Sequence, residues 1–441
     1  MTSLDWIAGP GAPLRGRIEV PGDKSVSHRA IMFSAIAEGD TVVDSFLEGE
    51  DTRATAAIFA RMGVRIDAPS DGRRVIRGVG LHGLSAPDAP LDCGNAGTAM
   101  RLLAGLLAGQ RFDSVLVGDD SLSRRPMRRV IDPLARMGAR IVPTAEGTAP
   151  LHIEGGRALH GIDYDAPVAS AQLKSALLLA GLYAQGDTCV REPHPTRDYT
   201  ERMLAAFGID VAIEGEGDVV RVRPGVLRSP GRIEVPGDFS SAAFFLVAAS
   251  VVPGSDLVIA NVGMSPRRTG LLDTLREMGA DIQVIASRTA GGHAVADLHV
   301  RHAPLRGIDV PASRVPDMID EFPALFVAAA LAQGTTRITG AAELRVKESD
   351  RIAVMAAGLR ALGIALEETP DGAAIEGGVP RGGQVDSAGD HRCAMSFAVL
   401  AQRATAPVTI ADCANVATSF PGFASLAAGT GMHLAASPDP D

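Results

Sequence analysis

The sequence predicts an α/β protein (α+β class) of two similar domains, each built from three βαβαββ units. Residues 16–23 and 231–238 both read Gly-Arg-Ile-Glu-Val-Pro-Gly-Asp, and identity over eight residues is hard to obtain by chance. In addition, a helical segment that ends in glycine and leads into a β-rich segment recurs six times, at intervals of about 70 to 85 residues. Such alternation of helices and strands is typical of layered α/β or α+β folds.

The eight-residue repeat also divides the chain. We expect a first lobe over residues 21–232 and a second lobe over residues 1–20 and 233–441. The strand before Pro21 is assigned to the second lobe because its copy, at residues 233–235, begins that half. A protein of two lobes usually places its site in the cleft between them, so we expect the site there.

Composition excludes several classes of function. The formal net charge is −10, and an acidic protein is a poor general binder of nucleic acid or of an anionic membrane. The longest apolar runs are too short to span a bilayer, and residues 1–11 lack the pattern of a signal peptide. The four cysteines show no CxxC spacing, so we expect free thiols and a cytoplasmic protein.

Lysine is rare in this chain, which makes its positions informative. Of the 42 Lys and Arg residues, only Lys24, Lys174 and Lys347 are lysines. An ammonium is a compact charge whose pKa shifts readily, and a guanidinium does not replace it in that role. The alternative interpretation is that the three lysines occur at these positions by chance, but each lies among other polar or charged residues.

Residues 16–29 form the first candidate site. A strand over residues 17–20 ends at a Pro-Gly pair, and a helix begins near Lys24. Lys24, Ser25, His28 and Arg29 therefore crowd the first turn, where free N–H groups and the helix dipole already favour an anion. An ordinary capped helix with exposed charges is the alternative. The second copy has Phe239 in place of Lys24, so the cationic chemistry is expected in one copy only.

Further helix starts in the first half are polar or cationic. Residues 92–101 combine two glycines with Asn95 and Thr98, both good N-cap residues. Residues 121–129 hold four arginines, which form either a solvated face or a clamp for carboxylate or phosphate. Residues 169–174 place Ser170, Gln172 and Lys174 at the start of a helix, and residues 194–199 open another.

The second half contributes two more charged clusters. Asp320 precedes the most apolar helix of the chain, where it is either a base with a raised pKa or an ordinary partner of the helix dipole. Residues 345–351 place Lys347 and Arg351 four positions apart, on one helical face. Residues 390–392 form a last cationic helix start. Together, these helix starts suit a small polyanion held between two lobes.

Several other classes of site are disfavoured. There is no GxxxxGK[ST] phosphate loop, which argues against a nucleotide-driven kinase. No HExxH sequence or Cys/His cluster predicts a metal site, and no GxSxG elbow predicts a serine hydrolase.

Taken in order, these motifs resemble those of the 5-enolpyruvylshikimate-3-phosphate synthases. The resemblance runs almost end to end, and two of its motifs are similar to those of the bacterial class II branch. It implies the inside-out α/β barrel fold of the enolpyruvyl transferases. The matching segments are Pro-Gly-Asp-Lys-Ser-x-Ser-His-Arg, Gly-Asn-Ala-Gly-Thr-Ala-Met-Arg, Arg-Pro-Met, Ser-Ala-Gln-x-Lys, Arg-Val-Lys-Glu-Ser-Asp-Arg and a late Asp-His-Arg.

The resemblance also implies a reaction. Enzymes of this family move the enolpyruvyl group of phosphoenolpyruvate to the 5-hydroxyl of shikimate 3-phosphate and release phosphate, without an organic cofactor or a metal. The expected partners are therefore these two small anions, with no nucleic acid and no membrane, and the expected state is a monomer. Glyphosate resembles phosphoenolpyruvate, and we expect it to enter an open space beside Gly97.

The resemblance assigns roles residue by residue. Asp320 matches the proton acceptor and Glu348 the proton donor to the methylene carbon, and Lys24 is the third catalytic residue. No residue is expected to bind a metal. Contacts to shikimate 3-phosphate are expected from Lys24, Ser25, Arg29, Ser170, Ala171, Gln172, Arg197, Asp320 and Lys347. Contacts to phosphoenolpyruvate are expected from Lys24, Gly97, Arg125, Gln172, Arg351 and Arg392.

These residue types suit the chemistry. Protonating a methylene while an alcohol attacks the neighbouring carbon requires an acid, a base and a dense cage of cations. One departure from the family pattern concerns residues 418–421. Many members carry a lysine just before a late Thr-Phe-Pro, whereas this chain has Thr418-Ser419-Phe420-Pro421.

Two other functions compete with this interpretation. A related enolpyruvyl transferase acts on UDP-N-acetylglucosamine, but it typically carries a reactive cysteine in a mobile loop, and residues 121–129 contain none. A non-enzymatic anion-binding scaffold is the second alternative. The grouping of Asp320, Lys347 and Glu348 beside cations favours an enzyme.

Overall fold

The computed structural model describes residues 4–290 and 292–437. Within them the chain forms two compact units, each with its own hydrophobic core. The first unit has Gly22–Val235 as its main body, and the second consists of Met1–Pro21, Pro236–Thr289 and His293–Asp441. The division expected from the sequence, at residues 20/21 and 232/233, differs from this one by one and by three residues.

The first unit contains three four-stranded sheets of one topology. In each sheet an edge strand runs parallel to its neighbour, and two antiparallel strands complete the sheet. The first sheet is β14 (Arg232–Glu234), β3 (Glu38–Asp44), β5 (Arg73–Val79), β4 (Arg65–Ser70). The second is β6 (Leu91–Asp92), β7 (Ser114–Val117), β9 (Leu151–Glu154), β8 (Arg140–Val142). The third is β10 (Asp163–Asp165), β11 (Thr188–Arg191), β13 (Val219–Val222), β12 (Val211–Glu214).

Two helices accompany each of these sheets. One helix of each pair is buried along most of its length, and the other covers the outside. The buried helices are α1 (Lys24–Ala35), α3 (Gly97–Ala108) and α5 (Ala171–Gly181), and the outer helices are α2 (Glu50–Arg61), α4 (Arg128–Arg136) and α6 (Tyr199–Ala206).

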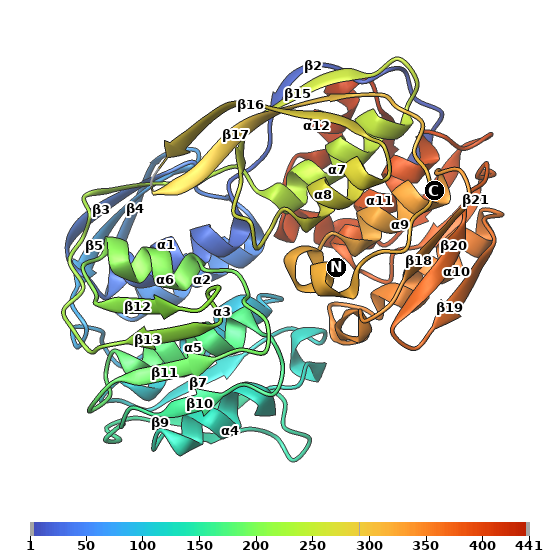
Figure 1. Cartoon of the computed structure of the whole chain (residues 1–441). Helices are drawn as coiled ribbons and strands as arrows, with labels where there is room; N and C mark the ends of the chain where they lie inside the picture. The colour runs from blue at the N-terminus through green and yellow to red at the C-terminus, as the bar shows by residue number, and fades with distance from the viewer. Residues whose placement is uncertain (1–3, 291, 438–441) are drawn as a thin grey trace. The chain divides into compact units, whose positions relative to one another are not determined.

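The second unit repeats this plan. Its long hairpin of β16 and β17 lies beside β15 and β2 (Figure 1). The first sheet is β2 (Arg15–Glu19), β15 (Asp256–Gly263), β17 (His293–Arg301), β16 (Asp281–Ala290). The second is β18 (Thr335–Ile338), β20 (Gly372–Glu376), β19 (Leu366–Thr369), with Asp309 bridged in parallel to Arg337 at its edge. The third is β21 (Gly383–Asp386), β22 (Val408–Ala411), β1 (Trp6–Gly9), β23 (His433–Ala436).

The prediction of two lobes with three βαβαββ units each is confirmed, with one addition. The sixth unit lacks its own last strand, and β1 from the other end of the chain takes that place between β22 and β23. The last of the six glycines that follow a predicted helix is Gly431, and β23 begins two residues after it. No sequence pattern indicated that β1 would complete this sheet.

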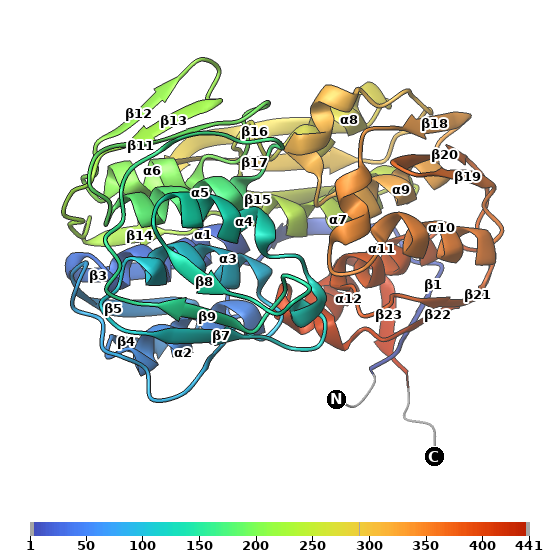
Figure 2. The same ribbon diagram turned by 90° about the horizontal axis from the view of Figure 1, so that it is seen from below.

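The inner helices of the second unit explain how its core is built. They are α7 (Phe239–Val251), α9 (Phe322–Ala330) and α11 (His391–Ala401), and Figure 2 shows them side by side. All 13 residues of α7 are buried, as expected for a helix that is apolar on every face. The outer helices are α8 (Gly270–Glu277), α10 (Arg351–Ala361) and α12 (Phe423–Thr430).

The duplicated segment connects the two units by an exchange of strands. β2 ends before Pro21 and pairs with β15 of the second unit, while the chain continues into α1 of the first unit. Conversely, β14 pairs with β3 of the first unit before the chain enters α7. The expectation that residues 233–235 belong to the second lobe is therefore corrected. The side chains of Ile233 and Val235 lie in the core of the first unit, and those of Ile18 and Val20 in the core of the second.

The close packing of α3 on α5 yields a prediction. A Cβ atom at Gly105 would lie 2.1 Å from the carbonyl oxygen of Ala176, so Gly105→Ala should force the two helices apart. We expect a loss of about 1–3 kcal/mol in the free energy of unfolding, measured by urea denaturation.

Gly429→Ala is the matched control. Gly429 lies exposed in α12, and nothing is within 4 Å of an added Cβ. This variant should gain about 0.5–1 kcal/mol, because alanine favours a helix more than glycine does. Equal stabilities of the two variants would contradict the proposed packing.

Candidate functional site

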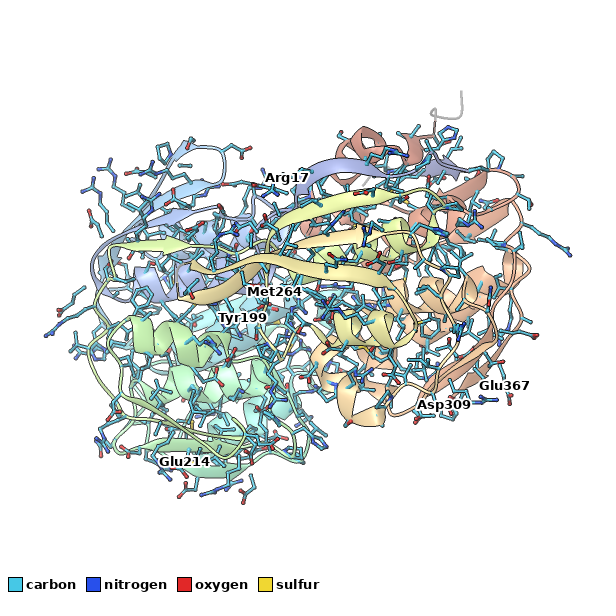
Figure 3. The ribbon with its side chains drawn as sticks, turned by 45° about the horizontal axis from the view of Figure 1, so that its top comes forward. Arg17, Tyr199, Glu214, Met264, Asp309 and Glu367 are labelled. Atoms are coloured by element: carbon cyan, nitrogen blue, oxygen red, sulfur yellow. The ribbon has the colours of Figure 1, made fainter. Side chains whose placement is uncertain are left out.

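The first turn of α1 carries Lys24 as its first residue. Asp23 caps the helix, since its carboxylate accepts hydrogen bonds from the backbone N–H of Val26 (2.9 Å) and from the hydroxyl of Tyr199 on α6 (3.0 Å; Tyr199 is labelled in Figure 3). The ammonium of Lys24 forms an ion pair with Asp51 on α2. Sequence reasoning missed Asp51, because an acidic residue in a first helical turn looks ordinary.

Arg29 lies beneath this turn and is only 3% exposed. Its guanidinium donates to the hydroxyls of Thr200 (2.7 Å) and Ser175 (2.8 Å) and to the carbonyl oxygen of Ser25 (3.0 Å). Burial lowers the pKa of Arg29 to about 10, and the charge of Arg197 acts in the same direction, against that of Glu201. Arg29 thus holds the start of α1 against α5 and α6 from below.

Ser170 is the N-cap of α5, as its type suggests. Its hydroxyl accepts from the N–H of Leu173 (3.4 Å), and its own N–H donates to Glu192 (2.9 Å). Lys174, 1% exposed, lies between Glu192 (2.8 Å) and Glu201 (2.7 Å). Burial alone would lower the pKa of Lys174, but the two carboxylates outweigh it and raise that pKa. This lysine is therefore a charged support inside the first unit.

A second group of predicted residues gathers at the start of α3. The amide of Gln172 accepts from Arg101 (2.7 Å) and donates to the hydroxyl of Thr98 (3.0 Å). Arg125 donates to the side-chain oxygen of Asn95 (2.8 Å). Asn95 and Thr98 are therefore not N-caps as predicted, since the N-cap position of α3 is Ala96.

The expected open space beside Gly97 is wrong. A Cβ atom at Gly97 would lie 2.8 Å from Nη1 of Arg125 and 3.1 Å from Nη1 of Arg101. The two guanidinium groups occupy the space that the missing side chain leaves. Gly97 is thus a place where cations approach the backbone closely.

The four arginines of residues 121–129 divide between the two interpretations. Arg125 is 7% exposed and turns inward, whereas Arg124 and Arg128 are exposed. Arg128 donates to the carbonyl oxygen of Ala145 (3.2 Å). One arginine of the run, Arg125, is therefore buried beside Gly97 and Asn95. The helix begins at Arg128, two residues after the proline expected to start it.

In the second unit, Asp320 lies directly before α9 in a cage of cations. Its Oδ1 is 3.5 Å from the ammonium of Lys347 and 3.5 Å from Nη1 of Arg351, and its Oδ2 is 3.3 Å from Nη1 of Arg268. Arg392 donates to the backbone carbonyl oxygen of Asp320 (3.1 Å). Four predicted residues, Asp320, Lys347, Arg351 and Arg392, are therefore brought together, with Arg268 as a fifth that the sequence did not indicate.

Arg351 is 1% exposed and is held by carboxylates. Its Nε donates to Asp390 (2.8 Å), and its Nη2 donates to Glu348 (2.6 Å). Burial would lower the pKa of Arg351, but the charges of Asp390, Glu348 and Asp320 raise it above its ordinary value. Burial alone would raise the pKa of Asp390, but the charge of Arg351 keeps that pKa below its ordinary value. Both groups are charged.

Lys347 follows a short 3-10 turn, Ala342–Val346, and its side chain is 21% exposed. Desolvation lowers the pKa of Lys347, and the charge of Asp320 opposes this shift. An ammonium with a lowered pKa next to a carboxylate is suited to proton transfer or to contact with an anionic substrate.

Thr418, where the family resemblance led us to look for a lysine, contributes no cation. Thr418 is buried, and its hydroxyl donates to the carbonyl oxygen of Asn415 (2.7 Å). The hydroxyl therefore closes a local turn.

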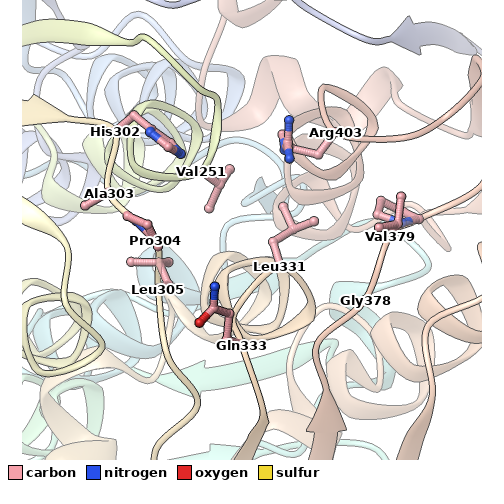
Figure 4. A pocket seen from close by; sticks show the side chains of 11 residues that line it. Val251, His302, Ala303, Pro304, Leu305, Leu331, Gln333, Gly378, Val379 and Arg403 are labelled. Atoms are coloured by element: carbon pink, nitrogen blue, oxygen red, sulfur yellow. The ribbon is translucent and has the colours of Figure 1, made fainter.

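A hollow elsewhere in the second unit contains none of the predicted residues (Figure 4). Val251, Leu331 and Arg403 line it, at or just beyond the C-terminal ends of α7, α9 and α11. Two second-unit candidates, Asp320 and Arg392, lie at the opposite ends of α9 and α11, about 14–17 Å away for helices of this length. Over residues 4–290 and 292–437, no group of His, Cys, Asp and Glu could hold a metal, and no helix is both long and apolar enough to cross a bilayer.

Two α/β units of three repeats each, with paired charges at the starts of their inner helices, define the enolpyruvyl transferase class. The solved enolpyruvyl transferase NikO from Streptomyces tendae shares this fold, with a TM-score of 0.79 over 99% of this chain and all of that one, at 18% identity. The chain belongs to the EPSP synthase (3-phosphoshikimate 1-carboxyvinyltransferase) family, whose model matches residues 9–426.

Individual relatives agree with this membership. A 3-phosphoshikimate 1-carboxyvinyltransferase of Xanthomonas campestris pv. campestris (strain B100) is 63% identical over 434 residues, which cover 98% of each chain. The corresponding protein of Xanthomonas euvesicatoria pv. vesicatoria (strain 85-10) is 64% identical over 97% of each chain. The solved EPSP synthase from Acinetobacter baumannii is 52% identical, with a TM-score of 0.88 over 99% of this chain and 100% of that chain.

The predicted reaction is thereby confirmed. The protein transfers the enolpyruvyl group of phosphoenolpyruvate to the 5-hydroxyl of shikimate 3-phosphate and releases phosphate, a step of the shikimate pathway to aromatic amino acids.

His28 gives a prediction about acid stability. It is fully buried, with Nδ1 2.8 Å from the hydroxyl of Thr55, and burial, then Lys24 and Arg29, lower its pKa well below 6.5. The unfolded chain takes up a proton there below about pH 6.5 and the folded chain does not, so stability is complete above that pH and falls below it. His28 should contribute up to about 1.4 kcal/mol per pH unit to that fall.

His28→Asn should remove this part of the slope between pH 6.5 and 5.5 in urea unfolding. The variant will also be less stable at pH 7.5, because the bond to Thr55 changes. His152→Asn, at an exposed position of β9, is the control and should keep the original slope. An unchanged slope in His28→Asn would show that His28 does not stay neutral in the folded chain.

Proposed function

We propose that both units supply groups to this transfer, the first mainly for binding and the second for proton movement. The observation that carries the proposal is the position of Asp320, whose Oδ1 is 3.5 Å from both Lys347 and Arg351. The carboxylate of Asp320, held between two cations, is placed to accept a proton. Glu348, bonded to Arg351, places a second carboxyl group nearby that can donate one.

Shikimate 3-phosphate is proposed to bind Lys24, Ser25, Ser170, Ala171 and Gln172 of the first unit. These residues stand at the starts of α1 and α5, where free N–H groups and the helix dipoles favour a phosphate. Arg197 is proposed to complete the phosphate site, with Arg29 beneath it. The burial of Arg29 and its bond to Ser25 favour support from below over direct contact. Asp320 and Lys347 are proposed to meet the substrate hydroxyl groups.

Phosphoenolpyruvate is proposed to bind a set of cations from both units. In the first unit the proposed contacts are Arg125, the backbone at Gly97 and Gln172, which lie near the start of α3. Lys24, at the start of α1, is the fourth proposed contact of this unit. In the second unit Arg392 and Arg351 take part. Nη1 of Arg351 is buried and makes no hydrogen bond among the described residues, although Oδ1 of Asp320 lies 3.5 Å away, so a substrate oxygen would compete with Asp320 for this donor. Guanidinium groups match carboxylate and phosphate oxygens in geometry.

The proposed mechanism is addition followed by elimination. The oxygen of the 5-hydroxyl bonds to C2 of phosphoenolpyruvate while Asp320 accepts the proton of that hydroxyl. Glu348, in its protonated form, donates a proton to the methylene carbon. Glu348, then a carboxylate, takes a proton back from the resulting methyl group as phosphate departs from C2, and the double bond is restored. Lys24 stabilises the negative charge of the leaving phosphate. Cations already in place cost little reorganisation when that charge develops.

The state and location of the protein are also proposals. We propose a monomer in the cytoplasm, in keeping with four cysteines that are buried and unpaired in the described residues. Light scattering after gel filtration tests the first point, and fractionation of cells tests the second. A mass of twice 45.6 kDa would contradict the monomer.

The catalytic roles can be tested by phosphate release that requires both substrates. Lys24→Met and Asp320→Ala should each lower kcat by at least about 100-fold, since a general base and a charge-stabilising donor are each worth that much. Circular dichroism should show an intact fold. Asp67→Ala, at an exposed ion pair of β4, is the control and should keep full activity. Near-normal turnover in either test variant would remove that residue from the mechanism.

Glyphosate is proposed to compete with phosphoenolpyruvate. In Gly97→Ala the new methyl group should displace Arg125 and Arg101, whose nitrogens lie 2.8 and 3.1 Å from it. We therefore expect the glyphosate inhibition constant to rise at least about tenfold, together with the KM for phosphoenolpyruvate, because Arg125 is proposed to bind both molecules. Gly429→Ala serves as the control. An unchanged inhibition constant would place glyphosate elsewhere.

A further inference from the structure

Arg268 is a buried cation to which the family reaction gives no role so far. It lies in the loop between β15 and α8 and is 3% exposed. Its Nη2 donates to Asp238 (3.1 Å) and to the hydroxyl of Ser240 (2.5 Å), and its Nη1 faces Asp320 (3.3 Å) and Glu321 (3.3 Å). One guanidinium group therefore joins the start of α7 to the start of α9.

The internal repeat explains why an arginine is needed there. In the first copy of the duplicated segment, the residue after the capping aspartate is Lys24, which pairs with Asp51 on the following helix. In the second copy that residue is Phe239, which is buried in the core and brings no charge. The cation beside the second cap, Asp238, comes instead from the loop before α8. Cationic chemistry is thus present in both copies, carried by different elements.

We propose that Arg268 is a positioning residue for Asp320 in the transfer reaction. This proposal rests on the role of Asp320 as the base. Arg268 holds Oδ2 of the carboxylate, and this leaves Oδ1 turned towards Lys347 and Arg351, both at 3.5 Å. The carboxylate is then fixed in rotation about its χ2 bond, with one oxygen directed to the cations proposed to meet the substrate.

Arg268 also helps to keep Asp320 ionised. The cations facing the carboxylate are Arg268 from the loop before α8, Lys347 after the 3-10 turn and Arg351 from α10, and Arg392 of α11 lies at its backbone carbonyl. The nearby anions are Glu321, Glu348 and Asp390, each of which faces an arginine. Removal of one of the three facing cations should make protonation of Asp320 easier.

The test is the pH dependence of turnover in Arg268→Gln. We expect kcat to fall about tenfold while KM for each substrate changes less than about threefold, because the lost interaction acts on the base and not on ground-state binding. The acidic limb of the kcat profile should move to higher pH by roughly 0.5–1 unit, since a base that protonates more easily becomes inactive at a higher pH. A merely structural role would leave that limb in place.

Two further variants serve as comparisons. Arg268→Lys keeps a positive charge but cannot contact Asp238 and Asp320 with two separate nitrogens. The acidic limb of the kcat profile should therefore stay near its original pH while kcat remains reduced. Arg314→Gln is the matched control. Arg314 lies in the same unit but pairs with Glu277 and Thr274, so its loss should change neither kcat nor the limb.

If Arg268→Gln does not fold, the pair Arg268→Gln/Glu321→Gln removes one cation and one anion together, with Glu321→Gln alone as its reference. The same shift of the limb is expected between these two. An unmoved limb in a folded variant, while Asp320→Ala is inactive, would overturn the role of Arg268 and leave Asp320 as the base. An active Asp320→Ala would instead overturn the proposed base, whatever Arg268 does.

Discussion

The second unit depends on the buried ion pair between Arg351 and Asp390. Asp390 caps α11 through the N–H of Arg392 (2.9 Å) and accepts from Arg351 (2.8 Å), so the starts of α10 and α11 are locked to one another. Arg351 in turn holds Glu348 and faces Asp320. Either charge alone would be very costly to bury, typically by 3–5 kcal/mol when one partner of such a pair is removed. The geometry of the proposed acid and base is therefore a consequence of charge balance inside the unit.

The first unit also balances its buried charges, but with different partners. There the two most deeply buried cations are Arg29 and Lys174. The partners of Arg29 include two hydroxyl groups, and those of Lys174 are two carboxylates. The compact ammonium of Lys174 fits between Glu192 and Glu201 at a position that is 1% exposed. This accounts for a lysine in a chain that otherwise uses arginine: the residue supports Ser170 through Glu192 and does not itself touch the proposed substrate positions.

Local pattern predicted most of the fold and the helix starts that carry several candidate residues. The helix starts at Lys24, beside Ser170 and beside Asp390, and the six repeats, depend on short stretches of sequence, and all are observed. Arg268 was missed because it follows Pro266 and Arg267 in a segment that reads as an exposed turn. Its role depends on contacts with residues 30 and 52 positions away. The space at Gly97 was misjudged for the same reason, since arginine side chains from elsewhere fill it.

The pairing of β2 with β15 and of β14 with β3 limits when each unit can finish folding during synthesis. β1 and β2 leave the ribosome before the other elements described above, yet β15, the partner of β2, begins about 240 residues later, and β22, a partner of β1, later still. The first unit becomes complete only when β14 emerges, after nearly all of its other elements. Through most of translation the nascent chain therefore carries two unpaired strand edges at its leading end, which is where a chaperone that shields such edges would act.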